Sequence, residues 1–237
     1  MKSIDLLRKD LKKKSSRSKA KVLQGFFKTG EGEYGEGDIF LGITVPNSRE
    51  IAKKYSKIDI YTIQELLNSK VHEERLIALL ILANNYKKAS EEQKYQILSY
   101  YLKNTKQINN WDLVDLTADK ILGEYLLNKP KDILYQLANS DNLWERRISI
   151  ISTFQFIKNN QFEDTLNISK ILLKDEHDLI HKAVGWMLRE IGKRDIKTEE
   201  KFLKQHYKDM PRTMLRYAIE KFPEAKRQSY LKGKILI

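Results

Sequence analysis

The sequence contains no cysteine. This absence excludes disulfide bonds, a cysteine nucleophile and metal sites built on thiolates, and it favours residence in the cytoplasm. Long apolar runs are missing too, because the longest is the eight-residue run Leu76–Ala83, whereas a membrane-spanning helix needs roughly 20 residues. The basic first residues are not followed by an apolar segment, so we expect no signal peptide and no association with a membrane.

Helix breakers are scarce as well. The four prolines all fall where a helix can begin or where two helices can be joined. No stretch alternates apolar and polar residues between hairpin turns, so we predict an all-α protein without a β-sheet. The expected helices cover residues 3–14, 17–28, 46–55, 62–69, 73–87, 90–104, 110–127, 131–139, 142–159, 163–173, 178–193, 198–206, 211–221 and 224–232.

Several helix starts carry local signals. Thr62–Glu65 and Ser90–Gln93 match the capping box, in which the first and fourth side chains satisfy each other's free backbone donors. Asn110 and Asn142 are candidate N-caps, because each directly precedes an apolar run with helical periodicity.

From residue 73 onward the predicted helices form pairs at nearly regular intervals. The pairs begin 37, 32, 36 and 33 residues apart, at Glu73, Asn110, Asn142, Asp178 and Pro211. Such spacing is typical of solenoids built from HEAT-like repeats. We therefore predict that residues 1–237 form one domain, an α-α superhelix. It would comprise a helical hairpin over 1–28, a glycine-rich connection over 29–43 and helical repeats over 46–237.

The net charge of +12 is concentrated at the two ends of the chain. Residues 1–28 hold ten basic and two acidic residues, residues 193–237 hold thirteen and six, and residues 29–192 hold 21 and 24. Basic ends around a near-neutral centre suit a protein that grips a polyanion. Lysine-rich helices that only keep the protein soluble would give the same pattern.

The segment 29–43 interrupts the helical pattern, because it holds five of the ten glycines. A phosphate-binding loop is one interpretation. However, the segment also contains four acidic residues, and no Gly-Lys-Ser/Thr sequence follows it. A turn-rich or mobile connection between helices is the better explanation.

Trp111 and Asp115 stand four residues apart on a predicted helix and so share one face. An indole ring beside a carboxylate suits a cationic ligand, because the ring face and the carboxylate are both negative. Periodicity alone favours a different role for Trp111, as an aromatic residue of the core.

The next two pairs carry Arg147 and Trp186 on their first helices. Equivalent helices of stacked repeats line one surface, so these residues would share a groove with Trp111 and Asp115. Trp144 is better explained by packing between pairs. Gly185, costly in a helix, indicates either a ligand close to the backbone or tight helix packing.

Histidine offers little for a metal site. The pair His177 and His181 has helical spacing but lacks the glutamate of a His-Glu-x-x-His motif. We predict no metal.

Four stretches together resemble the bacterial AlkD-like DNA alkylation repair proteins. They span residues 26 to 190 in the order expected for that family: Phe26–Gly30 with Asp38–Pro46, Asn110–Asp115, Asp141–Arg147 and Lys182–Glu190. The resemblance implies a HEAT-like solenoid with a basic concave groove for duplex DNA. We expect a monomer, which is usual for solenoids of this size. It further implies a glycosylase that excises N3- and N7-alkylated purines without a metal or cofactor.

The resemblance also implies roles for individual residues. Trp111, Asp115 and Trp186 would be catalytic. Arg147 would bind a phosphate, Lys182 and Arg189 are further expected DNA contacts, and Phe26 would lie near the DNA.

Two other functions remain open. A non-catalytic DNA-binding relative would keep the basic ends but not the Trp–Asp pair. A protein-binding helical scaffold would not bind duplex DNA. Binding to duplex DNA with an affinity that falls steeply as the salt concentration rises would therefore exclude the scaffold.

Overall fold

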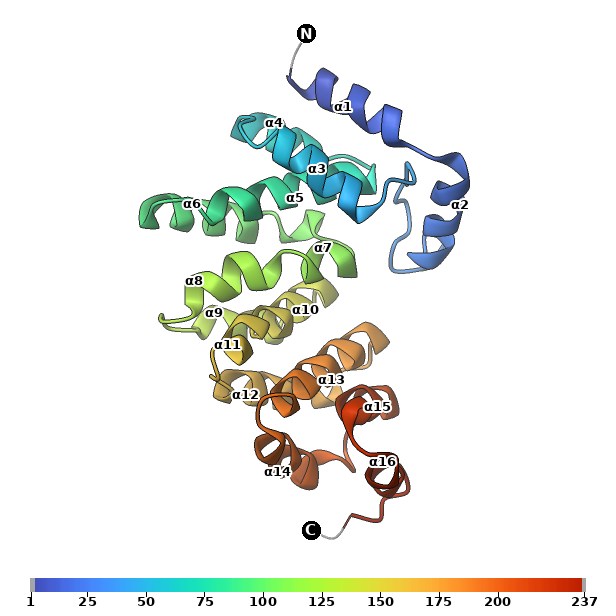
Figure 1. Cartoon of the computed structure of the whole chain (residues 1–237), viewed down its shortest axis with the longest axis vertical. Helices are drawn as coiled ribbons and strands as arrows, with labels where there is room; N and C mark the ends of the chain where they lie inside the picture. The colour runs from blue at the N-terminus through green and yellow to red at the C-terminus, as the bar shows by residue number, and fades with distance from the viewer. Residues whose placement is uncertain (1–2, 236–237) are drawn as a thin grey trace. The chain divides into compact units, whose positions relative to one another are not determined.

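The structure, a computed structural model, describes residues 3–235 and is helical along most of that length (Figure 1). Within the described residues there is no strand, and β-type pairing is limited to one isolated parallel bridge between Ile39 and Val71. The all-α prediction is confirmed. No helix in this range is long and apolar enough to cross a bilayer. The first two and last two residues of the predicted 1–237 domain lie outside the described residues.

The chain divides into two compact units, one ending at Thr117 and the other beginning at Ala118. The boundary falls inside the helix predicted over 110–127. That residues 1–237 form a single domain stays a prediction.

The first unit is organised around α5, which is buried along nearly its whole length. Helices α3 and α4 both pack against it. After a charged first turn, residues 76–83 of this helix are all apolar, which suits such a central position. The unit comprises α1 (Ser3–Lys14), α2 (Arg17–Phe26), α3 (Val45–Lys54), α4 (Ile60–Leu67), α5 (His72–Tyr86), α6 (Glu91–Lys103), η1 (Thr105–Gln107) and α7 (Trp111–Asp115).

The second unit has α13 at its centre, in contact with α10, α14 and α15. Where α13 meets α15, a Cβ atom on Gly185 would lie 2.4 Å from the carbonyl oxygen of Met214. Tight helix packing therefore accounts for this glycine. The unit comprises η2 (Asp119–Gly123), α8 (Glu124–Leu126), α9 (Asp132–Ala138), α10 (Leu143–Ser152), α11 (Phe154–Lys158), α12 (Glu163–Ile171), η3 (Leu172–Lys174), α13 (Asp178–Gly192), α14 (Ile196–His206), α15 (Arg212–Ala218), η4 (Ile219–Lys221) and α16 (Glu224–Leu231).

Two long predicted helices are wrong, because each is interrupted at a threonine. Helix α7 ends at Asp115 and a π-helical turn begins at Asp119, while α10 and α11 are separated by Thr153. The Thr117 hydroxyl donates to the Leu113 carbonyl at 2.5 Å, and the Thr153 hydroxyl donates to the Ile150 carbonyl at 2.7 Å. Such back-bonding bends a helix.

The predicted caps are mostly confirmed. Ser90 and Gln93 form both halves of a capping box, and the side chains of Asn110 and Asn142 accept backbone hydrogen bonds at helix starts. The capping box at Thr62 is wrong, because Asp59 caps α4 instead and accepts from the Thr62 N–H at 2.8 Å.

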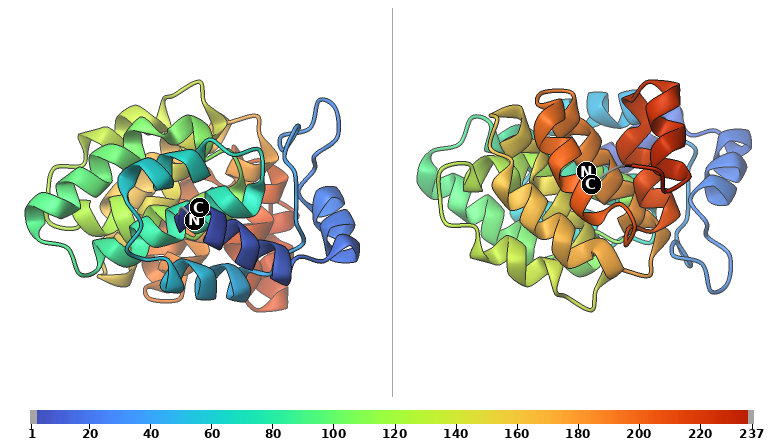
Figure 2. Two further views of the ribbon diagram at one scale, coloured as in Figure 1. Left: turned by 90° about the horizontal axis from the view of Figure 1, so that it is seen from above. Right: turned by 90° about the horizontal axis from the view of Figure 1, so that it is seen from below.

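The connection between α2 and α3 is rich in turns, as predicted, and runs beside α2 (Figure 2). Its end is fastened by Glu73, whose carboxylate accepts backbone N–H bonds from residues 41, 42 and 43 at 2.9–3.1 Å. Gly42 has a φ of +79°, and a Cβ there would lie 2.2 Å from the Ser16 carbonyl oxygen. Only glycine fits this close approach to the start of α2.

Candidate functional site

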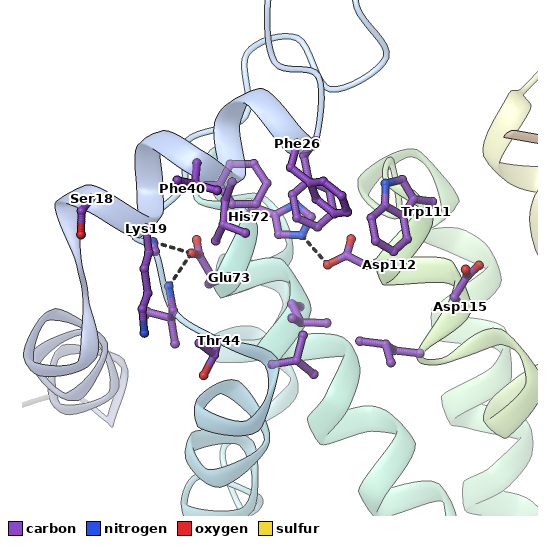
Figure 3. A pocket seen from close by; sticks show the side chains of 18 residues that line it. Ser18, Lys19, Phe26, Phe40, Thr44, His72, Glu73, Trp111, Asp112 and Asp115 are labelled. Atoms are coloured by element: carbon purple, nitrogen blue, oxygen red, sulfur yellow. Dashed lines mark hydrogen bonds and ion pairs between the residues drawn. The ribbon is translucent and has the colours of Figure 1, made fainter. Parts of the chain in front are cut away.

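The first unit contains an open pocket of about 580 Å³ (Figure 3). Its walls come from α2, the connection, and the first turns of α3, α5 and α7. Most lining side chains are apolar, and the polar exceptions include Lys19, His72, Asp112 and Asp115. A concave, mainly apolar surface with a few polar groups is typical of ligand sites.

Three of the predicted site residues, Trp111, Asp115 and Phe26, line this pocket. Trp111 and Asp115 are the first and last residues of α7, whose start is fixed by the Asn110 side chain accepting from the Trp111 N–H at 2.8 Å. Both side chains are half-buried, and Phe26 is 60% exposed. The Phe26 ring meets the Trp111 indole edge-on, with centroids 5.7 Å apart. None of the three is sealed in the core.

A stack of rings supports the indole, and our sequence analysis missed it. Phe27 lies parallel to Trp111 with centroids 4.9 Å apart, and it also stacks on Phe40 at 4.9 Å. Phe40 in turn stacks on the His72 ring at 4.4 Å. Phe27 and Phe40 are buried. Because Phe27 covers one face of the indole, a ligand can reach only the other.

Behind this stack, His72 is buried between two carboxylates. Its Nε2 lies 2.8 Å from Asp112 Oδ2, and its Nδ1 lies 3.2 Å from Asp38 Oδ2. Burial lowers the pKa of His72, but the charge of Asp112 and hydrogen bonds to both carboxylates outweigh it and raise the pKa to about 9. The ring is therefore protonated at neutral pH.

Asp38 also accepts a hydrogen bond from Arg75 at 2.6 Å. Burial raises the pKa of Asp38, yet the hydrogen bond from His72 and the charge of Arg75 bring it below its usual value. In the sequence, Asp38 is one of the four acidic residues that argue against a phosphate-binding loop in segment 29–43, and it opens the stretch Asp38–Pro46 of the family resemblance. Neither observation predicted its contacts with His72 and Arg75.

The other predicted site residues belong to the second unit. Trp186 is half-buried on α13, and its Nε1 donates to Glu190 at 3.1 Å. Arg147 is buried on α10 and donates to the Leu179 carbonyl.

The two remaining predicted DNA contacts, Lys182 and Arg189, also lie on α13. Lys182 pairs with Asp178 at 2.7 Å, and Arg189 pairs with Glu220. A phosphate would have to compete with these partners. Trp144, which we expected to pack between helix pairs, is buried.

The histidine pair His177 and His181 makes other bonds. His177 caps α13 by accepting from the Leu179 N–H at 3.1 Å, and His181 bonds to the Asp175 carbonyl. Within residues 3–235, no group of three or more histidine, aspartate or glutamate side chains is placed to hold a metal ion.

A family model described as "DNA alkylation repair enzyme" matches residues 7–222, whereas no curated protein matches the chain. Among solved structures, the chain is similar to "Predicted DNA alkylation repair enzyme from Enterococcus faecalis", with a TM-score of 0.67 and 17% identity over 89% of this chain and 98% of that one. At this identity the likeness shows the fold, an all-α arrangement of helical repeats. Because the family match covers most of the sequence, the chain belongs to the DNA alkylation repair enzyme family.

Proposed function

We propose that the protein is a monofunctional DNA glycosylase that hydrolyses the N-glycosidic bond of cationic N3- and N7-alkylated purines in duplex DNA. The observation that carries the proposal is the meeting of Trp111 and Asp115 on the wall of one open pocket. Family membership supports a role in alkylation repair. Trp111 and Asp115 are the residue types that can stabilise a positively charged transition state.

The chemistry needs a negative site and no strong acid. A purine alkylated at N3 or N7 already carries a positive charge and leaves as a neutral base. Breaking its bond to deoxyribose develops oxocarbenium character on the sugar, which a nearby carboxylate stabilises. In this proposal Asp115 supplies that carboxylate and also holds the attacking water.

Trp111 contributes through the face that Phe27 leaves uncovered. A cation held over an indole face is stabilised by roughly 0.5–2 kcal/mol. Trp186 remains the predicted second indole of the site, and Arg147, Lys182 and Arg189 remain predicted contacts to DNA. The monomeric state and cytoplasmic residence also stay predictions.

The test is release of free base from duplex DNA containing 7-methylguanine, measured for the wild type and Asp115→Asn. We expect this isosteric change to lower the single-turnover rate on the order of 10²-fold or more, because the transition state loses its counter-charge. The dissociation constant for DNA should stay within about twofold. Asp141→Asn is a matched control, since Asp141 is exposed in the second unit, and it should behave as the wild type.

Two outcomes would oppose the proposal. Equal rates for the wild type and Asp115→Asn would remove Asp115 from the mechanism. A wild-type protein that binds duplex DNA in a salt-sensitive manner but releases no base from any N3- or N7-alkylated purine would be a non-catalytic member of the family.

A further inference from the structure

His72 occupies a position where a positive charge is unfavourable. It is the first residue of α5 and only 1% exposed, and the amino end of a helix repels cations. Arg75 brings a second buried positive charge one turn later. A buried charge persists only when it is paired and hydrogen-bonded, and here Asp38 and Asp112 meet that need.

With both carboxylates ionised, the geometry favours a charged imidazole. Each of its two nitrogens faces a carboxylate oxygen, at 2.8 and 3.2 Å. A neutral imidazole donates from one nitrogen only, and both nitrogens are donors in the imidazolium alone. Loss of the proton would leave a lone pair pointing at Asp38 or Asp112.

Arg75 shares Asp38 with His72, and both cations reach the same oxygen, Oδ2. The two glutamates of this region have separate partners, since Glu73 binds the backbone of residues 41–43 and Glu74 binds Arg8. Neither neighbouring glutamate is therefore in place to take over the role of Asp38 or Asp112.

Two independent lines of contact run from His72 to Trp111. The first is the hydrogen bond to Asp112, the residue that follows Trp111 in α7 (Figure 3). The second is the ring stack that passes through Phe40 and Phe27 to the indole. Helix α7 has only five residues, too few to hold its own geometry in water, so its position depends on such contacts.

We propose that His72 is a positioning residue of the Trp111–Asp115 site: as an imidazolium clamped by Asp38 and Asp112 it fixes α7 and the plane of the indole. The inference rests on the proposed function for its kinetic consequence. The physical link from His72 to Trp111 does not depend on catalysis.

The kinetic test uses His72→Gln, which keeps one donor and loses the charge. Because a misplacement of about 1 Å costs on the order of 10²-fold in rate, we expect kcat to fall roughly 10- to 100-fold while DNA binding changes less than about twofold. His206→Gln is the matched control, since this histidine also contacts an aromatic ring, that of Phe202, with centroids 4.6 Å apart and the planes tilted by 51°, but lies in the second unit. It should keep wild-type values.

A double variant separates positioning from simple damage to the fold. In His72→Gln alone, the buried carboxylate of Asp112 loses its cationic partner. The double variant His72→Gln/Asp112→Asn removes this carboxylate and replaces the ion pair by two neutral amide side chains. We expect this variant to recover part of the lost kcat. If His72→Gln retains the kcat and pH profile of the wild type while Asp115→Asn is inactive, positioning by His72 is wrong and the glycosylase proposal stands.

An NMR titration of the wild-type protein provides the second test and needs neither a variant nor activity. The His72 ring should titrate near pH 9, and the Trp111 indole N–H signal should move with the same midpoint. The indole signals of Trp144 and Trp186, in the second unit, should not follow. The inference would be overturned if the Trp111 indole N–H signal did not shift as His72 titrates, or if the His72 ring were neutral at pH 7. Either result would count whether or not the protein releases base.

Discussion

Replacing Gly185 by alanine tests how closely α13 packs against α15. An added Cβ would lie 2.4 Å from the Met214 carbonyl oxygen and 2.5 Å from the Cβ of Tyr217. Both are fixed parts of the neighbouring helix rather than flexible side-chain ends. The two helices must therefore separate by about 1 Å to reach ordinary contact distances.

Two opposing terms decide the size of the effect. Alanine is the better helix former by roughly 1 kcal/mol. Overpacking of a well-packed interface costs about 1–3 kcal/mol, and separating two backbones loses many other contacts at once. We expect a net decrease of about 1–2 kcal/mol in the free energy of unfolding.

The matched control is Gly25→Ala in α2, where a Cβ would have no neighbour within 4 Å. There only the helix propensity acts, so stability should rise by up to about 1 kcal/mol. Urea unfolding followed by far-UV circular dichroism compares both variants with the wild type. If Gly185→Ala proves as stable as Gly25→Ala, the close approach of the two helices is wrong.

Three further substitutions test other contacts. Burial and the charge of Glu200 raise the pKa of Glu199 from 4.5 to about 8, so folding stability falls as pH rises through this range. Glu199→Gln should therefore stabilise the protein by roughly 4 kcal/mol at pH 8 and by less than about 1 kcal/mol at pH 5. Equal gains in urea unfolding at both pH values would contradict this. Glu73→Ala leaves the backbone N–H groups of residues 41–43 without an acceptor. The free energy of unfolding, measured by thermal unfolding, should then decrease by roughly 3 kcal/mol or more. A decrease below about 1 kcal/mol would show that water replaces the carboxylate. Ser90→Ala should cost about 1 kcal/mol through loss of the capping box, measured as faster amide exchange in the first turn of α6, and unchanged exchange would refute it.

The helices were predictable because their signals are local. Capping side chains such as Asn110 act on the next few residues, and apolar periodicity marks the buried face. The shared wall of Trp111 and Asp115 follows from the same local geometry, since four residues make about one helical turn. What local patterns missed were the breaks at Thr117 and Thr153, where side chain and backbone compete for the same carbonyl groups.

The support behind the site could not be predicted in this way. His72 meets carboxylates that lie 34 and 40 residues away along the chain, and no spacing rule connects such distant positions. Phe27 and Trp111 are likewise brought together only by the path of the connection between α2 and α3. In the sequence, neither His72 nor Phe27 differs from the ordinary residues of a helical protein.

The covered face of Trp111 has a consequence for the product of the proposed reaction. With Phe27 occupying one side of the ring, this indole can contribute one contact of roughly 0.5–2 kcal/mol to a bound cation. That is well short of the 4.1 kcal/mol that corresponds to a dissociation constant of about 1 mM. The excised purine is neutral and no longer attached to the duplex, so it would lose even this cation–π contact with Trp111 once the glycosidic bond is broken.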